Sequence, residues 1–275
     1  MIQIFLKSYY KKISLLLLSF LIFGCTTNQE NSNTNDDYSQ YFSNNSIATT
    51  IKLMPEEIYN NYEIAEPPKL KLKFITTEIY PCINYSLITS QFINGNTLIV
   101  RFEGVDNPGG ICLTAIGPAT KFIDLPLNIN KIVLLNGTTV DKYDVSINNE
   151  KVLVNLIQSS FSQSLFENTF RYPENSFAYV CGTNTTNTQS YNDFLNVLLS
   201  NNTLTEIYFQ GLGRIPYPTT TSGNWVNHPS RYFKYNNQSD FDALEPVLTV
   251  FKNQNVIPNS GVTINLISWN NKNLF

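Results

Sequence analysis

"YSLITSQFINGNTLIVRF", residues 85–102, contains the turn signal on which the predicted fold depends. Asn94-Gly95 separates two runs rich in apolar and β-branched residues, and this dipeptide is the strongest short signal for a β-hairpin. Asn136-Gly137 separates "KIVLL" from "TTVDKYDVSI" in the same way. We therefore predict two hairpins in this part of the chain.

Further strands are predicted on both sides of these hairpins. "KLKLKFITTEIY", residues 69–80, alternates lysine with apolar residues, which is typical of a strand with one wet face, and we interpret the lysines as solvated gatekeepers on a sheet edge. Turn residues recur roughly every 8 to 12 positions, so residues 67–158 are predicted to form a β-sandwich. This pattern resembles immunoglobulin-like modules, although no tryptophan lies between Cys82 and Cys112 to support antibody-type packing.

A different rhythm follows a predicted linker at residues 159–176. "SFAYVCG" predicts an apolar strand, and two helices are predicted where apolar residues recur at helical spacing, at 190–201 and 239–254. Each predicted helix has a possible capping box, Ser190 with Asp193 and Ser239 with Asp242. The order strand, helix, strand, strand, helix, strand is typical of a ferredoxin-like α+β domain, which we expect over residues 177–275.

The start of the chain predicts export. Three lysines precede an apolar run, Ile13–Phe23, that is too short to span a bilayer, which takes about 20 residues. Residues 1–24 are therefore interpreted as a secretory signal peptide. Ile22-Phe23-Gly24-Cys25 resembles the lipobox of bacterial lipoproteins, and this resemblance implies a diacylglyceryl group on Cys25 and cleavage just before it. The alternatives are an ordinary signal peptide and an uncleaved anchor.

The resemblance has consequences for location. Cys25 would hold the protein on a membrane of the bacterial cell envelope, and we expect the outer membrane, with the protein facing the periplasm or the surface. Residues 25–66 begin with a stretch rich in Asn, Ser and Thr and poor in aliphatic residues, which predicts a disordered tether. The membrane is thus the first predicted partner.

Composition excludes one class of partner. Charged residues make up only 14% of the 275 residues, and the formal net charge is −3. No cluster of lysine and arginine occurs after the leader, whereas nucleic-acid affinity comes largely from neutralised phosphates. We therefore expect no nucleic-acid partner.

The remaining cysteines divide into a pair and a single thiol. Cys82 and Cys112 are the predicted disulfide, because both lie in one predicted domain and export permits oxidation. Closing a loop of this length would stabilise the fold by about 3 to 4 kcal/mol. Cys181 is interpreted as a buried, inert thiol.

Residues with catalytic or metal-binding chemistry are sparse. His228 is the only histidine, which excludes sites built on two imidazoles, and a dyad with Cys181 would require an exposed thiol within about 3 Å of the ring. Spacings typical of zinc, calcium or phosphate sites are absent, so we predict no metal and no cofactor. Asp240, Asp242 and Glu245 are explained by the start of a helix, where carboxylates are favoured. We predict no catalytic residue.

One long loop, residues 213–232, is the candidate binding segment. Long loops inside compact domains are uncommon and tend to be functional or disordered. Tyr217, Trp225, His228 and Tyr232 are the predicted ligand-binding residues, because aromatic side chains on a stiff loop suit sugar rings or a protein partner. The alternative is that Trp225 packs in the core and the loop merely crosses the sheet.

Three functions follow from these observations. The first is a lipid-anchored, non-catalytic envelope lipoprotein that presents its C-terminal domain to a protein or a glycan. The second is an envelope hydrolase acting on peptidoglycan or glycan, with His228 or the Asp240 group in the site. The third is a structural subunit of an envelope complex.

Overall fold

The computed structural model describes residues 37–107, 109 and 115–275. The chain divides into two compact units, residues 1–40 and 41–275. Within the first, the described part is residues 37–40, where Oδ1 of Asp37 accepts a hydrogen bond of 2.9 Å from the backbone N–H of Ser39. The predicted signal peptide, Cys25 and Cys112 lie outside the described residues. Among the residues described, no helix has the length and apolarity needed to cross a membrane.

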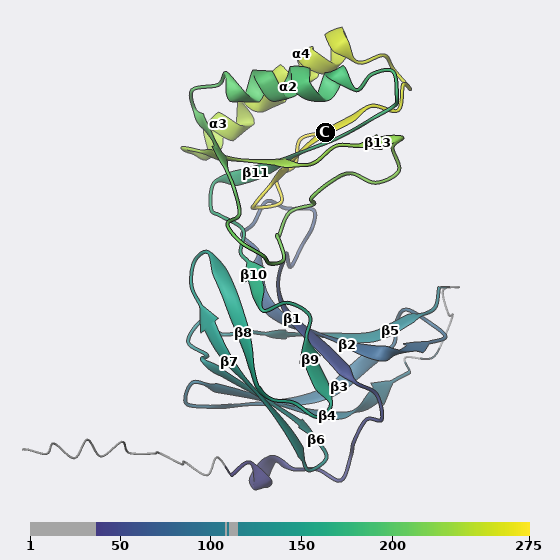
Figure 1. The fold of residues 1–275 in the computed structure, drawn as a ribbon, viewed down its shortest axis with the longest axis vertical. Helices are drawn as coiled ribbons and strands as arrows, with labels where there is room; N and C mark the ends of the chain where they lie inside the picture. The colour runs from purple at the N-terminus through teal and green to yellow at the C-terminus, as the bar shows by residue number, and fades with distance from the viewer. Residues whose placement is uncertain (1–36, 108, 110–114) are drawn as a thin grey trace, which may run out of the picture. The chain divides into compact units, whose positions relative to one another are not determined.

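The second unit holds a large sheet of ten strands, which Figure 1 shows to be curled. Its spatial order is β10-β8-β7-β6-β4-β3-β5-β2-β1-β9, and the pairs β1/β9, β3/β5 and β4/β6 are parallel. A short 3₁₀ helix, η1 (Ser39–Tyr41), precedes it. The strands are β1 (Ile51–Ile58), β2 (Lys69–Tyr80), β3 (Ser86–Asn94), β4 (Thr97–Asp106), β5 (Gly117–Asp124), β6 (Lys131–Asn136), β7 (Thr139–Ile147), β8 (Lys151–Gln158), β9 (Ser162–Ser164) and β10 (Asn168–Phe170).

Local signals in the sequence are confirmed in this sheet. Both Asn-Gly hairpins form, β3–β4 and β6–β7, and Gly95 and Gly137 have φ near +60°, at 58° and 63°. In the first half of β2, Leu70, Leu72 and Phe74 are buried and alternate with the lysines. The lysines do not lie on an edge, however, because β2 is flanked by β1 and β5, and Lys71 and Lys73 form ion pairs with Asp124 and Glu56.

Residues 159–170, which we expected to belong to a linker, join the two edges of the large sheet. β9 pairs with β1 at one edge, and β10 pairs with β8 at the other. The fully buried carboxylate of Asp141 accepts hydrogen bonds of 2.7 to 3.1 Å from three consecutive backbone N–H groups, those of Ser160, Phe161 and Ser162. A buried carboxylate is stable only when its oxygens are satisfied in this way.

A small antiparallel sheet of five strands follows. Its order is β12-β14-β11-β13, with β15 also paired to β11. The helices α2, α3 and α4 lie over one face of this sheet (Figure 1). The elements are β11 (Ser176–Thr183), α2 (Gln189–Leu199), β12 (Leu204–Ile207), β13 (Val226–Asn227), β14 (Arg231–Tyr235), α3 (Gln238–Asp242), α4 (Leu244–Asn255) and β15 (Thr263–Ser268).

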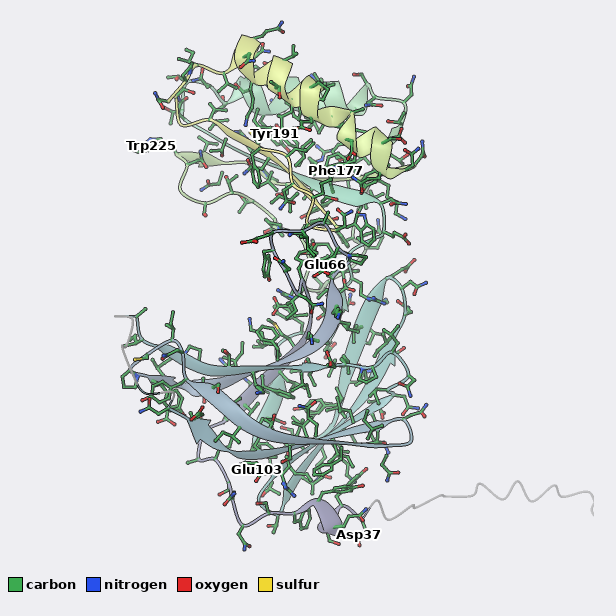
Figure 2. The ribbon with its side chains drawn as sticks, turned by 180° about the vertical axis from the view of Figure 1, so that it is seen from behind. Asp37, Glu66, Glu103, Phe177, Tyr191 and Trp225 are labelled. Carbon is green, nitrogen blue, oxygen red and sulfur yellow. The ribbon has the colours of Figure 1, made fainter. Side chains whose placement is uncertain are left out.

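The predicted apolar faces of the helices are confirmed. They pack on the residues of β11 that point to the same side, Phe177, Tyr179 and Cys181. The buried helical side chains are Tyr191, Phe194, Leu195 and Leu198 of α2, Phe241 of α3, and Leu244, Leu248 and Phe251 of α4. Figure 2 marks Phe177 and Tyr191 on this side of the sheet.

The opposite face of the small sheet is also covered. Every residue of β11 is buried, and Ala178 and Val180 pack against Tyr217. The cover comes from the long segment between β12 and β14, together with Tyr172. The small sheet therefore has helices on one face and an aromatic loop on the other.

The predicted fold class is wrong. The strands expected to form an immunoglobulin-like β-sandwich pair into one curled, mixed sheet, which also recruits β1, β9 and β10 from the predicted tether and linker. The C-terminal elements follow the expected order, but β13 adds a fifth strand. This sheet belongs to the same compact unit as the large sheet, so a separate ferredoxin-like α+β domain is not what forms.

Both predicted capping boxes are also misplaced. α2 begins at Gln189, so Ser190 lies within the helix, and the residue at its N-cap makes no side-chain cap. In α3 the capping box is formed by Asn237 and Asp240. The carboxylate of Asp240 is thus engaged in starting a helix.

Candidate functional site

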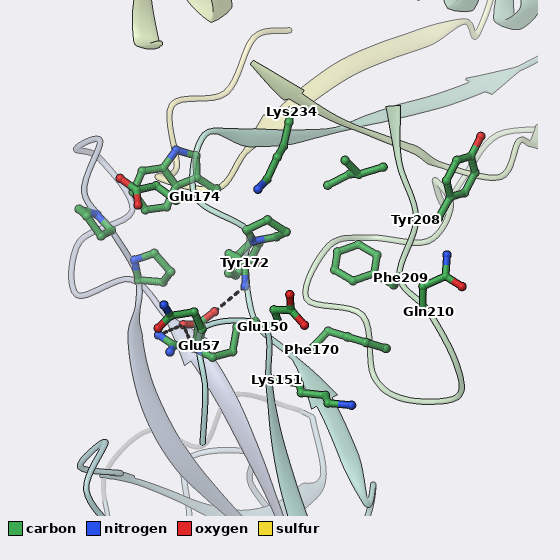
Figure 3. A pocket seen from close by; sticks show the side chains of 17 residues that line it. Glu57, Glu150, Lys151, Phe170, Tyr172, Glu174, Tyr208, Phe209, Gln210 and Lys234 are labelled. Carbon is green, nitrogen blue, oxygen red and sulfur yellow. Dashed lines mark hydrogen bonds and ion pairs between the residues drawn. The ribbon is translucent and has the colours of Figure 1, made fainter. Parts of the chain in front are cut away.

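A cavity of about 770 Å³ lies between the large sheet and the small sheet (Figure 3). Its walls come from β1, the turn between β7 and β8, the chain that follows β10, and the chain that follows β12. Pro67 and Pro68 before β2, Lys234 of β14, and Trp269 directly after β15 complete it. A cavity of this size falls within the range of small-molecule and cofactor sites.

Aromatic side chains make up much of the cavity wall. Five of them line it: Phe170, Tyr172, Tyr208, Phe209 and Trp269. Phe209 packs on Phe170 with ring centroids 5.2 Å apart. The indole N–H of Trp269 donates a hydrogen bond of 3.0 Å to the hydroxyl of Tyr235, which fixes the ring before a ligand arrives.

Four charged side chains of the cavity have no partner among the described residues. Glu150 and Lys151 lie at the turn between β7 and β8, Glu174 lies before β11, and Lys234 lies on β14. None of them makes an ion pair or a side-chain hydrogen bond within the part of the chain that the structure describes. Two positive and two negative groups are therefore available to a ligand.

Glu57, in contrast, is fully engaged with the protein. Oε1 accepts hydrogen bonds from Arg171, with Nε at 2.9 Å, and Oε2 accepts one of 2.7 Å from the backbone N–H of Tyr172. Burial raises the pKa of the Glu57 carboxyl, while the Tyr172 N–H and the Arg171 guanidinium oppose that rise. Glu57 thus ties β1 to the chain after β10, and its role at the cavity is structural.

The first part of the predicted loop is held beside the cavity by contacts with the large sheet. Arg214 forms an ion pair with Glu56 of β1, and the hydroxyl of Tyr172 donates a hydrogen bond of 2.9 Å to the carbonyl of Pro216. The backbone N–H of Phe170 donates to the carbonyl of Arg214 at 2.9 Å. These bonds position the chain on the C-terminal side of Phe209.

One of the predicted binding residues, Tyr217, belongs to the core, and a second, the partly buried Tyr232, packs against it. Tyr217 is only 3% exposed, and its hydroxyl lies 2.8 Å from that of Ser176. Its ring packs against Tyr172 at 4.8 Å and Tyr232 at 5.8 Å between ring centroids. We therefore do not expect Tyr217 or Tyr232 to contact a ligand, because their rings fill the space between the small sheet and its loop.

The other two predicted residues lie at the opposite end of β11 from the cavity. The ring of His228 stacks on Tyr191 at 4.5 Å, and its Nε2 lies 2.9 Å from the hydroxyl of Thr183. Burial lowers the pKa of His228. Trp225 is 85% exposed, so the alternative in which it packs in the core is wrong. The structure therefore separates the four predicted residues.

Cys181 and His228 do not form a dyad in the structure. Cys181 is buried and free, and burial raises the pKa of its thiol. The ring of His228 bonds to Thr183 instead of this thiol, so a dyad does not form. Within the described ranges, no group of three or more His, Cys, Asp or Glu side chains is arranged to hold a metal ion. Cys82 is buried, and its predicted bridge to Cys112 stays a prediction.

Sequence reasoning missed the cavity because its residues come from seven separate parts of the chain. One signal did exist: "SFAYVCG" is apolar on both faces, which is typical of a strand covered on both sides. Both faces of such a strand must be packed, and residues 213–232 were the segment left to cover the face opposite the helices. The position of the cavity beside that loop follows only from the pairing of β1, β8 and β10.

Comparison with known proteins adds no assignment. No protein-family model matches the sequence, and comparisons with curated proteins and with solved structures found no match.

Proposed function

We propose that the protein is a lipid-anchored, non-catalytic binding protein of the bacterial envelope, and that the cavity between its two sheets binds a glycan carrying charged groups. One observation carries the proposal: the cavity combines five aromatic side chains with four charged groups that have no partner among the described residues. The anchor at Cys25 and the envelope location rest on the leader and its lipobox-like end.

The cavity chemistry favours a glycan over other ligands. The flat faces of aromatic rings suit sugar rings, which present C–H groups on their faces and hydroxyls at their edges. An apolar ligand would gain nothing from these four charged groups, of which Glu150, Glu174 and Lys234 are exposed at the cavity. Charges of both signs suit a glycan with amino, carboxylate or phosphate substituents, whose ionic groups form the stronger class of hydrogen bonds.

The cavity proposal is tested with Trp269 as an internal reporter. The chain has two tryptophans, Trp225 and Trp269, so in Trp225→Phe the remaining indole fluorescence reports the cavity. The probes are charged oligosaccharides, namely chitosan oligomers, polygalacturonate oligomers and peptidoglycan fragments. We expect at least one of them to change Trp269 emission. Lys234→Ala and Phe209→Ala should each weaken that binding about tenfold. Lys121→Ala, a lysine of β5 that does not line the cavity, is the matched control.

Unchanged affinity in both cavity variants would refute the cavity as the site. Release of a shortened sugar from any probe would instead support the hydrolase hypothesis. One co-purifying partner at fixed stoichiometry, with no glycan binding, would support the structural subunit.

The anchor is tested separately by mass spectrometry of the exported protein. We expect a mature chain that begins at Cys25 and carries fatty acids, and Cys25→Ala should release the protein from the membrane fraction. A mature chain that begins elsewhere would contradict the anchor and leave the cavity proposal unaffected.

A further inference from the structure

Trp225 lies where three loop segments meet at the end of the small sheet (Figure 2). We call residues 183–188, 219–228 and 259–263 together the Trp225 end. An indole that is 85% exposed is unusual, because large aromatic rings gain most of their stabilisation from burial. The contacts of the surrounding segments therefore show whether the position of the Trp225 indole is fixed by the fold.

The three segments are bonded to one another. Nδ2 of Asn224 donates a hydrogen bond of 2.6 Å to the carbonyl of Gly261, and Nδ2 of Asn184 donates one of 2.7 Å to the carbonyl of Ser260. Val226 pairs with Thr183 of β11. The Trp225 end is thus one connected piece of structure.

The backbone on both sides of Trp225 is fixed by its contacts with β11. Gly182 of β11 makes room for Asn224, the residue before Trp225, because a Cβ on Gly182 would lie 2.2 Å from Oδ1 of Asn224. On the other side, Val226 and Asn227 pair with Thr183 and Gly182 of β11. Little conformational entropy of the loop would therefore be lost when a ligand stacks on this indole.

The Trp225 end contains no Asp, Glu, Lys or Arg. Trp225 is also its only large apolar side chain classed as exposed. The remaining residues are mostly Thr, Asn, Ser and Gly, so the three segments present neutral amide and hydroxyl groups.

We propose that the Trp225 end is a second binding site, which takes an uncharged glycan by stacking Trp225 on one pyranose ring. The ring of a neutral sugar offers a C–H face to the indole and hydroxyls to the surrounding amides and hydroxyls. This site is distinct from the cavity, since the cavity lies at the start of β11, next to Ser176, and Trp225 lies at its end, next to Thr183.

Two other partners fit this surface less well. A stable protein interface usually buries about 800 Å² per partner around a cluster of apolar anchors, whereas this surface has one exposed large apolar side chain. A membrane surface is typically bound through several apolar residues together with lysine or arginine, and the Trp225 end has no such cation.

The test uses Trp269→Phe, in which Trp225 is the only tryptophan. Cellohexaose, maltohexaose, hexa-N-acetylchitohexaose and xylohexaose, all uncharged, are the probes. We expect at least one of them to change Trp225 emission, and saturation-transfer NMR on the otherwise unaltered protein to show contact with the same sugar. Trp225→Ala should weaken the NMR-detected binding by about tenfold or more. Phe275→Ala, an exposed aromatic of similar accessibility at 75%, is the matched control and should bind normally.

Gly182→Ala provides a second variant that keeps Trp225 itself. Its Cβ would displace Asn224, so binding should weaken although the indole is present. Binding that survives Trp225→Ala would overturn the proposal, and so would the absence of binding to all four sugars. Capture of a protein partner that depends on Trp225 would overturn it in favour of a protein interface. Loss of cavity binding has its own reporter, Trp269, so the two proposals fail independently.

Discussion

The cavity and the Trp225 end lie at opposite ends of β11 and differ in chemistry. The cavity is hollow and holds four charges that are unpaired among the described residues, whereas the Trp225 end projects one indole from a surface without charged residues. Both draw on the same chain segment between β12 and β14, since residues 208–210 line the cavity and residues 219–228 belong to the Trp225 end.

Between these two regions the same segment contributes to the core. Tyr217 is buried against the face of the small sheet opposite the helices, while Trp225, eight positions later, is 85% exposed. The two residues are similar in chemistry and close in sequence. Their different roles arise from which part of the sheet lies beside each of them, so residue type alone does not separate a core aromatic from a binding aromatic.

The largest expected effect separates these roles by stability. Tyr217→Ala should lower the free energy of unfolding by about 3 to 5 kcal/mol, because it removes a buried ring between Tyr172 and Tyr232. Trp225→Ala should change it by no more than about 0.5 kcal/mol, as for other exposed positions. Urea unfolding measures both. Similar losses in the two variants would show that Trp225 is part of the core after all.

The next prediction concerns the support of the cavity. Arg171→Ala would leave the Glu57 carboxylate, whose side chain is 5% exposed, without its cation, and should cost about 3 kcal/mol. Cavity binding should weaken while binding at the Trp225 end stays the same. Lys71→Ala is the control, because its partner Asp124 is 76% exposed and surface pairs contribute about 1 kcal/mol or less. Equal loss at both sites would show that they are coupled.

Ionic strength should affect ligand affinity at the two sites differently, with a smaller effect than the substitutions above. Raising ionic strength from about 0.01 M to about 0.1 M shortens the screening length from about 30 Å to about 10 Å, so attraction to exposed charges declines. We expect a several-fold loss of affinity for a charged oligosaccharide at the cavity and no change for a neutral one at the Trp225 end. Isothermal titration at the two salt concentrations measures this contrast. A cavity affinity that is independent of salt would argue against its charged groups as ligand contacts.

The smallest effect involves pH and the single histidine. Burial lowers the pKa of His228, so the folded state binds fewer protons than the unfolded state, whose histidine has a pKa of about 6.5. Stability should therefore be constant above about pH 6.5 and fall as the pH drops toward the lowered pKa. His228→Gln should flatten this part of the stability profile in thermal unfolding. An unchanged profile would show that another group causes the dependence.

Local features of the fold were predictable, and its assembly was not. The hairpins at Asn94-Gly95 and Asn136-Gly137 and the apolar faces of α2 and α4 depend on neighbours close in sequence. The pairing of β1 with β9 and of β4 with β6 depends on long-range contacts that leave no periodic signal. The same set of correctly predicted strands can pair into a β-sandwich or into one curled sheet, so the strands alone do not determine the fold.

The candidate sites show the same division. The long loop was recognised as unusual, and Trp225 is exposed as a binding residue must be. The roles of Tyr217 and Tyr232 were missed, because their burial depends on β11 being covered on both faces. The cavity residues Glu150 and Glu174 carry no motif at all, since only the tertiary pairing of distant strands brings them to one place.

The parallel pairing of β1 with β9 sets the order of events during synthesis. Ile51 must wait for Ser162, about 110 residues later, before the edge of the large sheet can close. Contacts so distant in sequence slow folding and leave a strand edge open to wrong partners in the meantime. This edge of the large sheet therefore stays incomplete until residues 162–164 have been synthesised, however early β1 is complete.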